Sequence, residues 1–170
     1  MSKRQPWRKM LAVPLILCGA FFAQGEAISG DVAGQNVAEM KFGMFPGFPT
    51  CSTGSVQNGD PMKSPSIILV KTAKGCSFPW HWHTPNEHLM MVTGVARLEM
   101  KDGGKPLMLR TGGYALMPAK HVHQFRCVSS SCAVYLYSDA APFDIHYVDE
   151  QGTEISPDDA LKAVKETAAK

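Results

Sequence analysis

The sequence has few charged residues and no long apolar run. Only 19% of its 170 residues are charged while 45% are hydrophobic, which is typical of a globular chain and not of a disordered one. The most apolar segment, residues 10–22, is shorter than the roughly 20 residues that a membrane-spanning helix needs. The chain also lacks the glycine-rich spacings that bind nucleotide phosphates, and it shows no internal repeat. We therefore expect one globular domain without a nucleotide cofactor.

Basic residues gather at the N-terminus. Four of the 17 lysines and arginines precede the apolar segment, and small residues follow it. This order predicts a signal peptide over residues 1–25, cut after Gly25 or after Ala27, and hence a protein of the bacterial periplasm or a secreted one. An uncleaved membrane anchor is the alternative. Removing residues 1–25 takes away no acidic residue and changes the formal net charge from +2 to −2, so we expect neither a nucleic-acid partner nor a stable membrane span.

The cysteine count agrees with export. Cys18 lies in the predicted signal peptide, and the four that remain suggest two disulfides in an oxidising compartment. Cys127 and Cys132 flank Val-Ser-Ser-Ser, a predicted hairpin tip that would hold them close enough to bridge. This leaves Cys51 and Cys76 for the second bond. Buried free thiols are the alternative.

Short runs of apolar and β-branched residues fill the middle of the chain. Residues 28–65, rich in Gly, Pro and Ser, are expected to form an irregular arm with at most one short strand. Between residues 66 and 148, glycine- and serine-containing turns separate short apolar runs at nearly even spacing, which predicts an all-β barrel or sandwich. These runs are 67–71, 89–92, 95–100, 107–110, 114–117, 124–128, 133–137 and 145–148. In the tail, residues 149–170, Ser156 and Pro157 predict the start of one helix.

Four side chains of metal-binding type occur at spacings that bring them together. His81 and His83 are two residues apart, so on a strand they face the same side. Glu87 follows the turn-rich residues 84–86 and can start the returning strand, and His123 begins another strand. Imidazole and carboxylate groups converging inside a barrel suit Mn, Fe, Co, Ni or Zn. We predict one divalent metal ion per chain.

Two motifs carry a resemblance to a known family. Residues 75–94 match the pattern G-x5-H-x-H-x3-E-x6-G at every fixed position, and residues 112–127 resemble G-x5-P-x-G-x2-H-x3-N. In the second motif Lys120 replaces a glycine and Cys127 replaces an asparagine. Both are motifs of the cupin superfamily, and the chain resembles small exported single-domain cupins without an assigned reaction.

The resemblance implies a cupin β-barrel of the jelly-roll type, often found as a homodimer. It also implies that His81, His83, Glu87 and His123 hold the metal. The replacement at Lys120 puts the usual tight turn in question, since a left-handed backbone there costs a residue with a side chain about 1–2 kcal/mol.

The alternation of side chains along a strand assigns the remaining candidates. His121 lies two residues before His123 and is expected on the same side of the strand. It either lies at the cavity mouth, where it would support the metal ligands or act as a spare one, or belongs to the surface. His88 is expected to point outward. The expected pocket lining is apolar and suits an aromatic or short apolar ligand. It comprises Phe78, Met91, Met117, Phe125 and Tyr135.

Two classes of function remain open. In the first, open positions on the metal take an enolate or oxygen. The protein is then a dioxygenase-like oxidoreductase or an isomerase acting on a small enolisable or aromatic compound, with Glu87 as the candidate base. In the second, the barrel binds a small molecule or metal without turnover, as a sensor or carrier. The fold alone does not distinguish them.

Overall fold

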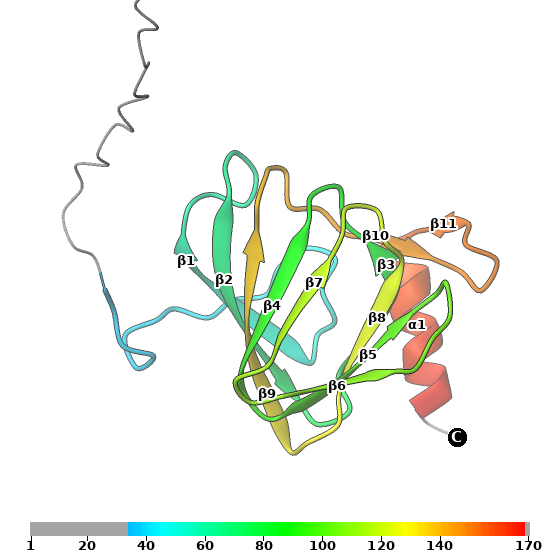
Figure 1. The fold of residues 1–170 in the computed structure, drawn as a ribbon, viewed down its shortest axis with the longest axis horizontal. Coiled ribbons are helices and arrows are strands. Elements are labelled where there is room, and N and C mark those ends of the chain that lie inside the picture. Colours follow the sequence, from blue (N-terminus) through cyan, green and yellow to red (C-terminus); the bar gives the residue numbers. More distant parts are fainter. Residues whose placement is uncertain (1–33, 169–170) are drawn as a thin grey trace, which may run out of the picture. The chain divides into compact units, whose positions relative to one another are not determined.

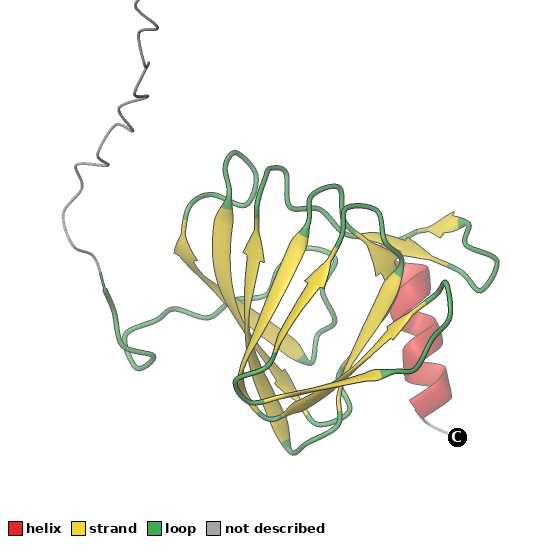
Figure 2. Cartoon of the chain, viewed as in Figure 1, coloured by secondary structure: helices red, strands yellow, loops and turns green. Residues whose placement is uncertain are grey.

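The computed structural model describes residues 34–168, with side chains up to residue 162. The predicted signal peptide lies outside the described residues. The described chain is mostly β (Figures 1 and 2), and none of its helices has the length and apolar character to cross a membrane. Its elements are β1 (Ser52–Asn58), β2 (Ser66–Ala73), β3 (Ser77–Trp82), β4 (Glu87–Thr93), β5 (Val95–Met100), β6 (Leu107–Arg110), β7 (Tyr114–Met117), β8 (His123–Cys127), β9 (Ser131–Ser138), β10 (His146–Val148), β11 (Glu154–Ile155) and α1 (Pro157–Ala168).

Two antiparallel sheets form a jelly-roll barrel, as the sequence predicts. The first has the strand order β1-β2-β9-β4-β7 and the second the order β11-β10-β3-β8-β5-β6. Because side chains alternate between the two faces of a strand, every second residue enters the core. Burial along β9 follows this rule, since Val134 and Leu136 are buried while Ala133, Tyr135 and Tyr137 are only partly covered.

The barrel begins earlier than residue 66. Strand β1 lies within the segment that the sequence indicates as an irregular arm, and it pairs with β2 over seven residues of chain. Ahead of it, Phe48 enters the core and packs edge-on against Phe78, with ring centroids 5.0 Å apart. Phe45, whose ring centroid lies 5.5 Å from that of Phe48, lies close against β1, and Gly54 permits this because a Cβ there would lie 2.6 Å from the ring of Phe45. The arm therefore closes one side of the barrel, a role its glycine- and proline-rich composition conceals.

Both expected disulfides are present. Cys51 is bonded to Cys76 and Cys127 to Cys132, with Cα atoms 5.6 and 5.8 Å apart. The two bonds lie close together, because the N–H of Cys127 donates to the carbonyl of Cys76 at 3.0 Å. One end of the barrel is thus cross-linked across β1, β3, β8 and β9.

The turn before β8 keeps its tight shape despite Lys120. This residue has a φ of 61°, in the left-handed region that favours glycine. Its N–H donates to the carbonyl of His83 at 2.8 Å. The turn therefore anchors the backbone at one of the candidate metal ligands.

Candidate metal centre

Three histidine side chains meet inside the barrel. His81 lies on β3 and His123 lies opposite it on β8, while His83 follows the end of β3. One ring nitrogen from each lies within 4.8 Å of the others, and none of the three residues is more than 3% exposed. Phe78 and His81 are three residues apart, and both face inward because the register of β3 shifts between them.

The other nitrogen of each ring is held by the backbone. Each Nδ1 lies at a main-chain carbonyl oxygen: that of Pro79 for His81 at 2.6 Å, that of Asp144 for His83, and that of His121 for His123 at 2.9 Å. A carbonyl only accepts hydrogen bonds, so each Nδ1 must carry a proton. All three Nε2 atoms are thereby left as the metal-facing nitrogens, the arrangement found in histidines that bind metals.

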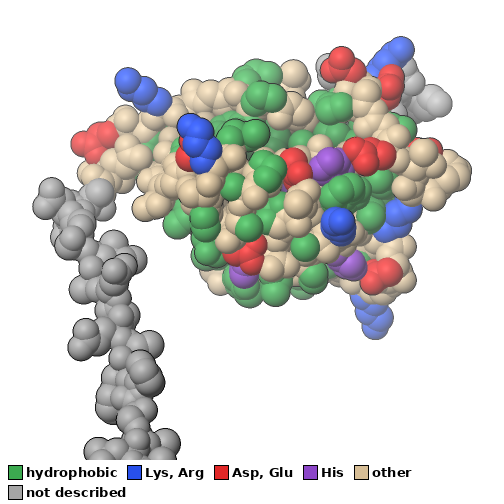
Figure 3. Space-filling model, turned by 90° about the horizontal axis from the view of Figure 1, so that it is seen from above, with side chains coloured by type: hydrophobic (Ala, Val, Ile, Leu, Met, Phe, Trp, Pro, Cys, Tyr) green, Lys and Arg blue, Asp and Glu red, His purple; other side chains and the backbone are tan. Residues whose placement is uncertain are grey.

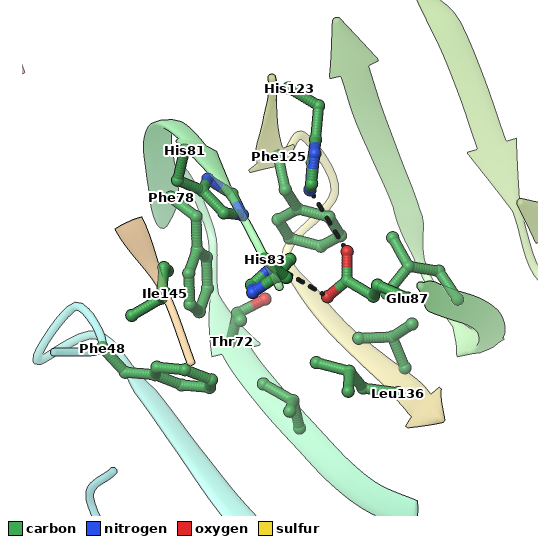
Figure 4. A pocket seen from close by; sticks show the side chains of 13 residues that line it. Phe48, Thr72, Phe78, His81, His83, Glu87, His123, Phe125, Leu136 and Ile145 are labelled. Atoms are coloured by element: carbon green, nitrogen blue, oxygen red, sulfur yellow. Dashed lines mark hydrogen bonds and ion pairs between the residues drawn. The ribbon is translucent and has the colours of Figure 1, made fainter. Parts of the chain in front are cut away.

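Glu87 reaches the cluster from the opposite sheet, where it begins β4. Its Oε2 lies 3.2 Å from Nε2 of His123 and its Oε1 lies 3.5 Å from Nε2 of His83, as drawn in Figure 4. Burial raises the pKa of Glu87, but the two histidines outweigh burial and the net shift is downward. For His123, burial lowers the pKa and the hydrogen bond that it donates to Glu87 raises it, with a net upward shift. Glu87 is therefore ionised within the cluster.

The other two histidines are neutral. Burial lowers the pKa of both His81 and His83, and the neighbouring His123 lowers both further. The attraction of Glu87 opposes the shift at His83 without cancelling it. The buried Nε2 of His83 also lacks a hydrogen-bond partner. Metal coordination needs neutral imidazoles with free nitrogens, so these residues fit a divalent cation and the three-histidine cluster can hold one.

A cavity of about 30 Å³ adjoins the cluster. Two of the expected residues, Phe78 and Phe125, line it together with the three histidines and Glu87 (Figure 4). No pattern in the sequence indicates the remaining seven lining residues, because they belong to ordinary apolar strands or to the arm. They are Phe48, Val70, Thr72, Leu89, Val134, Leu136 and Ile145.

Three residues expected in the pocket lie elsewhere. Met91 and Met117 are buried in the core without lining the cavity. Tyr135 alternates along β9 with residues that do line it, so its side chain belongs to the outer face of the sheet. For Tyr135 the expectation failed because the sequence shows which residues alternate without showing which set faces inward.

The family comparison agrees with this geometry. Residues 68–138 match the cupin domain family Cupin_2. The protein contains a cupin domain. No match was found among the curated proteins.

Solved structures with the same fold have varied functions. A polyketide cyclase from Streptomyces resistomycificus has a TM-score of 0.59 at 15% identity, over 71% of this chain and 89% of the cyclase. An RmlC-like cupin from Ralstonia eutropha has a TM-score of 0.58 at 16% identity, over 80% and 88% of the two chains. A DMSP lyase from Ruegeria pomeroyi has a TM-score of 0.55 at 18% identity, over 68% and 64%. At such identities the likeness shows the fold alone.

Two further histidines lie outside the cavity of this cupin. The Nε2 of His121 lies 3.1 Å from Oδ2 of the exposed Asp102, so its side chain belongs to the surface and only its carbonyl supports the cluster. The Nδ1 of His88 lies 2.7 Å from the hydroxyl of Tyr114. Neither side chain belongs to the three-histidine cluster or lines the cavity.

Two aspartates between β9 and β10 form hydrogen bonds with the loop that joins β3 to β4, residues 83–86. Asp144 accepts hydrogen bonds from the N–H and the hydroxyl of Thr84, at 2.7 and 2.6 Å. Asp139 accepts from the N–H and the side-chain amide of Asn86, at 3.1 and 2.6 Å. The main-chain carbonyl of Asp144 also accepts a hydrogen bond from Nδ1 of His83. Since 61 residues separate these last two, no local spacing in the sequence relates them.

We expect Asp144→Ala to weaken metal binding about 10- to 100-fold, because loss of the carboxylate frees the backbone that orients His83. Competition with a chromogenic zinc chelator measures the change. Asp158→Ala, an exposed position on α1, is the control and should bind zinc as the unchanged protein does. Equal affinity in all three proteins would show that Asp144 does not orient the ligand.

Proposed function

We propose that this cupin is an exported, metal-dependent enzyme that acts on a short, enolisable oxo compound. His81, His83, His123 and Glu87 hold the metal, and Mn or Zn is favoured because Fe(II) oxidises readily outside the cytoplasm. The observation that carries the proposal is the cavity wall. Apart from these four side chains, the described residues lining it are apolar except for one threonine. A metal held by these residues would face this cavity, where a substrate could bind beside it.

The size of the cavity favours a short ligand over an aromatic one. A volume of about 30 Å³ admits roughly two water molecules, whereas pockets for drug-sized ligands measure about 300–1,000 Å³. An aromatic or flavonol-like compound would need the lining to move apart. A compound of a few carbon atoms requires a smaller adjustment of the wall.

Glu87 is the residue that we assign to proton transfer. Its two oxygens face different histidines, so one can bind the metal while the other accepts a proton from the carbon beside the carbonyl. A bound divalent metal supplies stabilisation of the negative charge that develops on the substrate oxygen. The apolar wall excludes bulk water from this charge and strengthens the interaction.

The first test is whether the metal is open to small molecules. Protein reconstituted with Mn(II) should enhance water-proton relaxation, because at least one bound water exchanges. Zn(II)-loaded protein, which is diamagnetic, gives the baseline. A closed site without exchangeable water would contradict the enzyme. Deuterium exchange at the α-carbon of short oxo acids would then separate an isomerase from an oxygenase, which instead consumes oxygen.

The alternative is a carrier or sensor that binds without turnover, and the small volume of the cavity is the observation that favours it. We also propose that the protein is exported, binds a small molecule and forms a homodimer. Export is supported by the two disulfides. A small-molecule ligand is supported by Figure 3, where lysine and arginine side chains are scattered over the face shown and form no continuous basic surface. A homodimer is supported by exposed Met90, Tyr114 and Leu116 on neighbouring strands of one sheet.

A further inference from the structure

One polar side chain in the cavity wall is not a metal ligand. Thr72 lies on β2, is 4% exposed and lines the cavity with its inward-facing neighbour Val70. Its hydroxyl is buried and has no hydrogen-bond partner. Figure 4 shows the Thr72 hydroxyl turned toward the histidine cluster from the apolar part of the wall.

A hydroxyl in this position requires an explanation. Burial removes its hydrogen bonds to water, and an unpartnered buried group destabilises the fold. Valine has nearly the same shape without this penalty, and Val70 and Val134 fill comparable positions in the same wall. The buried Nε2 of His83 also lacks a hydrogen-bond partner and lines the same cavity, where a metal would occupy it. By the same reasoning, the protein itself supplies no partner for the Thr72 hydroxyl, and a molecule bound in the cavity can supply one.

We propose that Thr72 is a specificity-determining residue that hydrogen-bonds the end of the substrate farthest from the metal. This inference rests on the proposed function, and it narrows the substrate to short oxo compounds with two polar ends. One end carries the oxygens that bind the metal, and the other carries a hydroxyl. Because the cavity is so small, a molecule that fills it reaches both the metal ligands and Thr72.

Two oxo acids differing by one hydroxyl test this pairing. Pyruvate binds metals through its carboxylate and oxo oxygens, and hydroxypyruvate adds a hydroxyl at the other end. Displacement of water from the Mn(II)-loaded protein reports the binding of each. The unchanged protein should bind hydroxypyruvate about fivefold more tightly than pyruvate, because one neutral hydrogen bond contributes roughly that factor.

The substitution Thr72→Val should abolish this preference while leaving pyruvate affinity within about twofold, because it removes only the hydroxyl. Thr72→Ser should keep the preference. Thr53→Val makes the same change on β1 outside the cavity and should alter nothing. Without ligand, Thr72→Val should unfold at the same or a higher temperature than the unchanged protein, since an unpartnered hydroxyl has been removed.

Each contrary result has a distinct meaning. If Mn(II) binds with exchangeable water but the unchanged protein shows no preference, or binds neither acid, the role of Thr72 is wrong while the metal site stands. A less stable Thr72→Val variant would show that the hydroxyl already has a partner in the resting protein, and would also overturn the inference. Failure of every variant and the unchanged protein to bind Mn(II) would instead reject the proposed function.

Discussion

Replacing His81 and His83 together with alanine should leave the purified protein without stoichiometric metal. The change removes two of the four proposed ligands, and loss of even a supporting residue commonly weakens metal binding 10- to 100-fold. Elemental analysis of protein purified without added metal measures the content directly. The unchanged protein should retain one ion per chain, and its melting temperature should rise when metal is added, because a ligand that binds only the folded state stabilises it.

A matched control separates the cluster from histidine content in general. The variant with His88→Ala and His121→Ala also loses two histidines, but their side chains lie outside the cavity. It should keep its metal. If the double variant of the cluster fails to fold, His123→Gln offers a milder test, because glutamine fills similar space without an imidazole. Unchanged metal content in both cluster variants would show that the metal, if any, binds elsewhere.

Much of this centre was predictable because it is encoded locally. The two-residue spacing of His81 and His83 and the position of Glu87 after a turn are short-range features, and strand alternation converts them into shared faces. The same alternation led to a wrong expectation for Tyr135, which does not line the cavity. Periodicity defines the two faces of a strand but does not say which of them is buried. The inward face of β9 is decided by pairing with β2 and β4, which is information from other parts of the chain.

The features that no pattern predicted are contacts between distant segments. Phe48 enters the cavity wall from a segment without any apolar period. Asp144 reaches the ring of His83 through a backbone carbonyl, so its identity carries little signal of that contact. Thr72 reads as one more residue of a β-branched strand, and its significance depends on having no partner in three dimensions. Such properties become visible only when the whole barrel is assembled.

The two disulfides should contribute unequally to stability. Removing Cys51 and Cys76 by a pair of alanine substitutions should lower the free energy of unfolding by about 3 kcal/mol, and removing Cys127 and Cys132 by about 2 kcal/mol. The reason is loop length, since the bonds span 25 and 5 residues and a longer closed loop restricts the unfolded chain more. Urea denaturation of each variant without reductant measures the difference. Thiol titration of the unfolded, unreduced mature protein should first find no free thiol.

Loss of the bond between Cys51 and Cys76 should also affect the cavity, because this bond fixes the segment that places Phe48 in the cavity wall. Loss of that bond loosens one wall beside the metal ligands, whereas the bond between Cys127 and Cys132 closes a hairpin at the end of β8 away from His123. We therefore expect weaker zinc binding in the first variant and unchanged binding in the second. Four free thiols in the titration would contradict the cross-linked end of the barrel. Equal stability in both variants would contradict the dependence on loop length, and equal zinc binding in both would contradict the link between Cys51 and the metal centre.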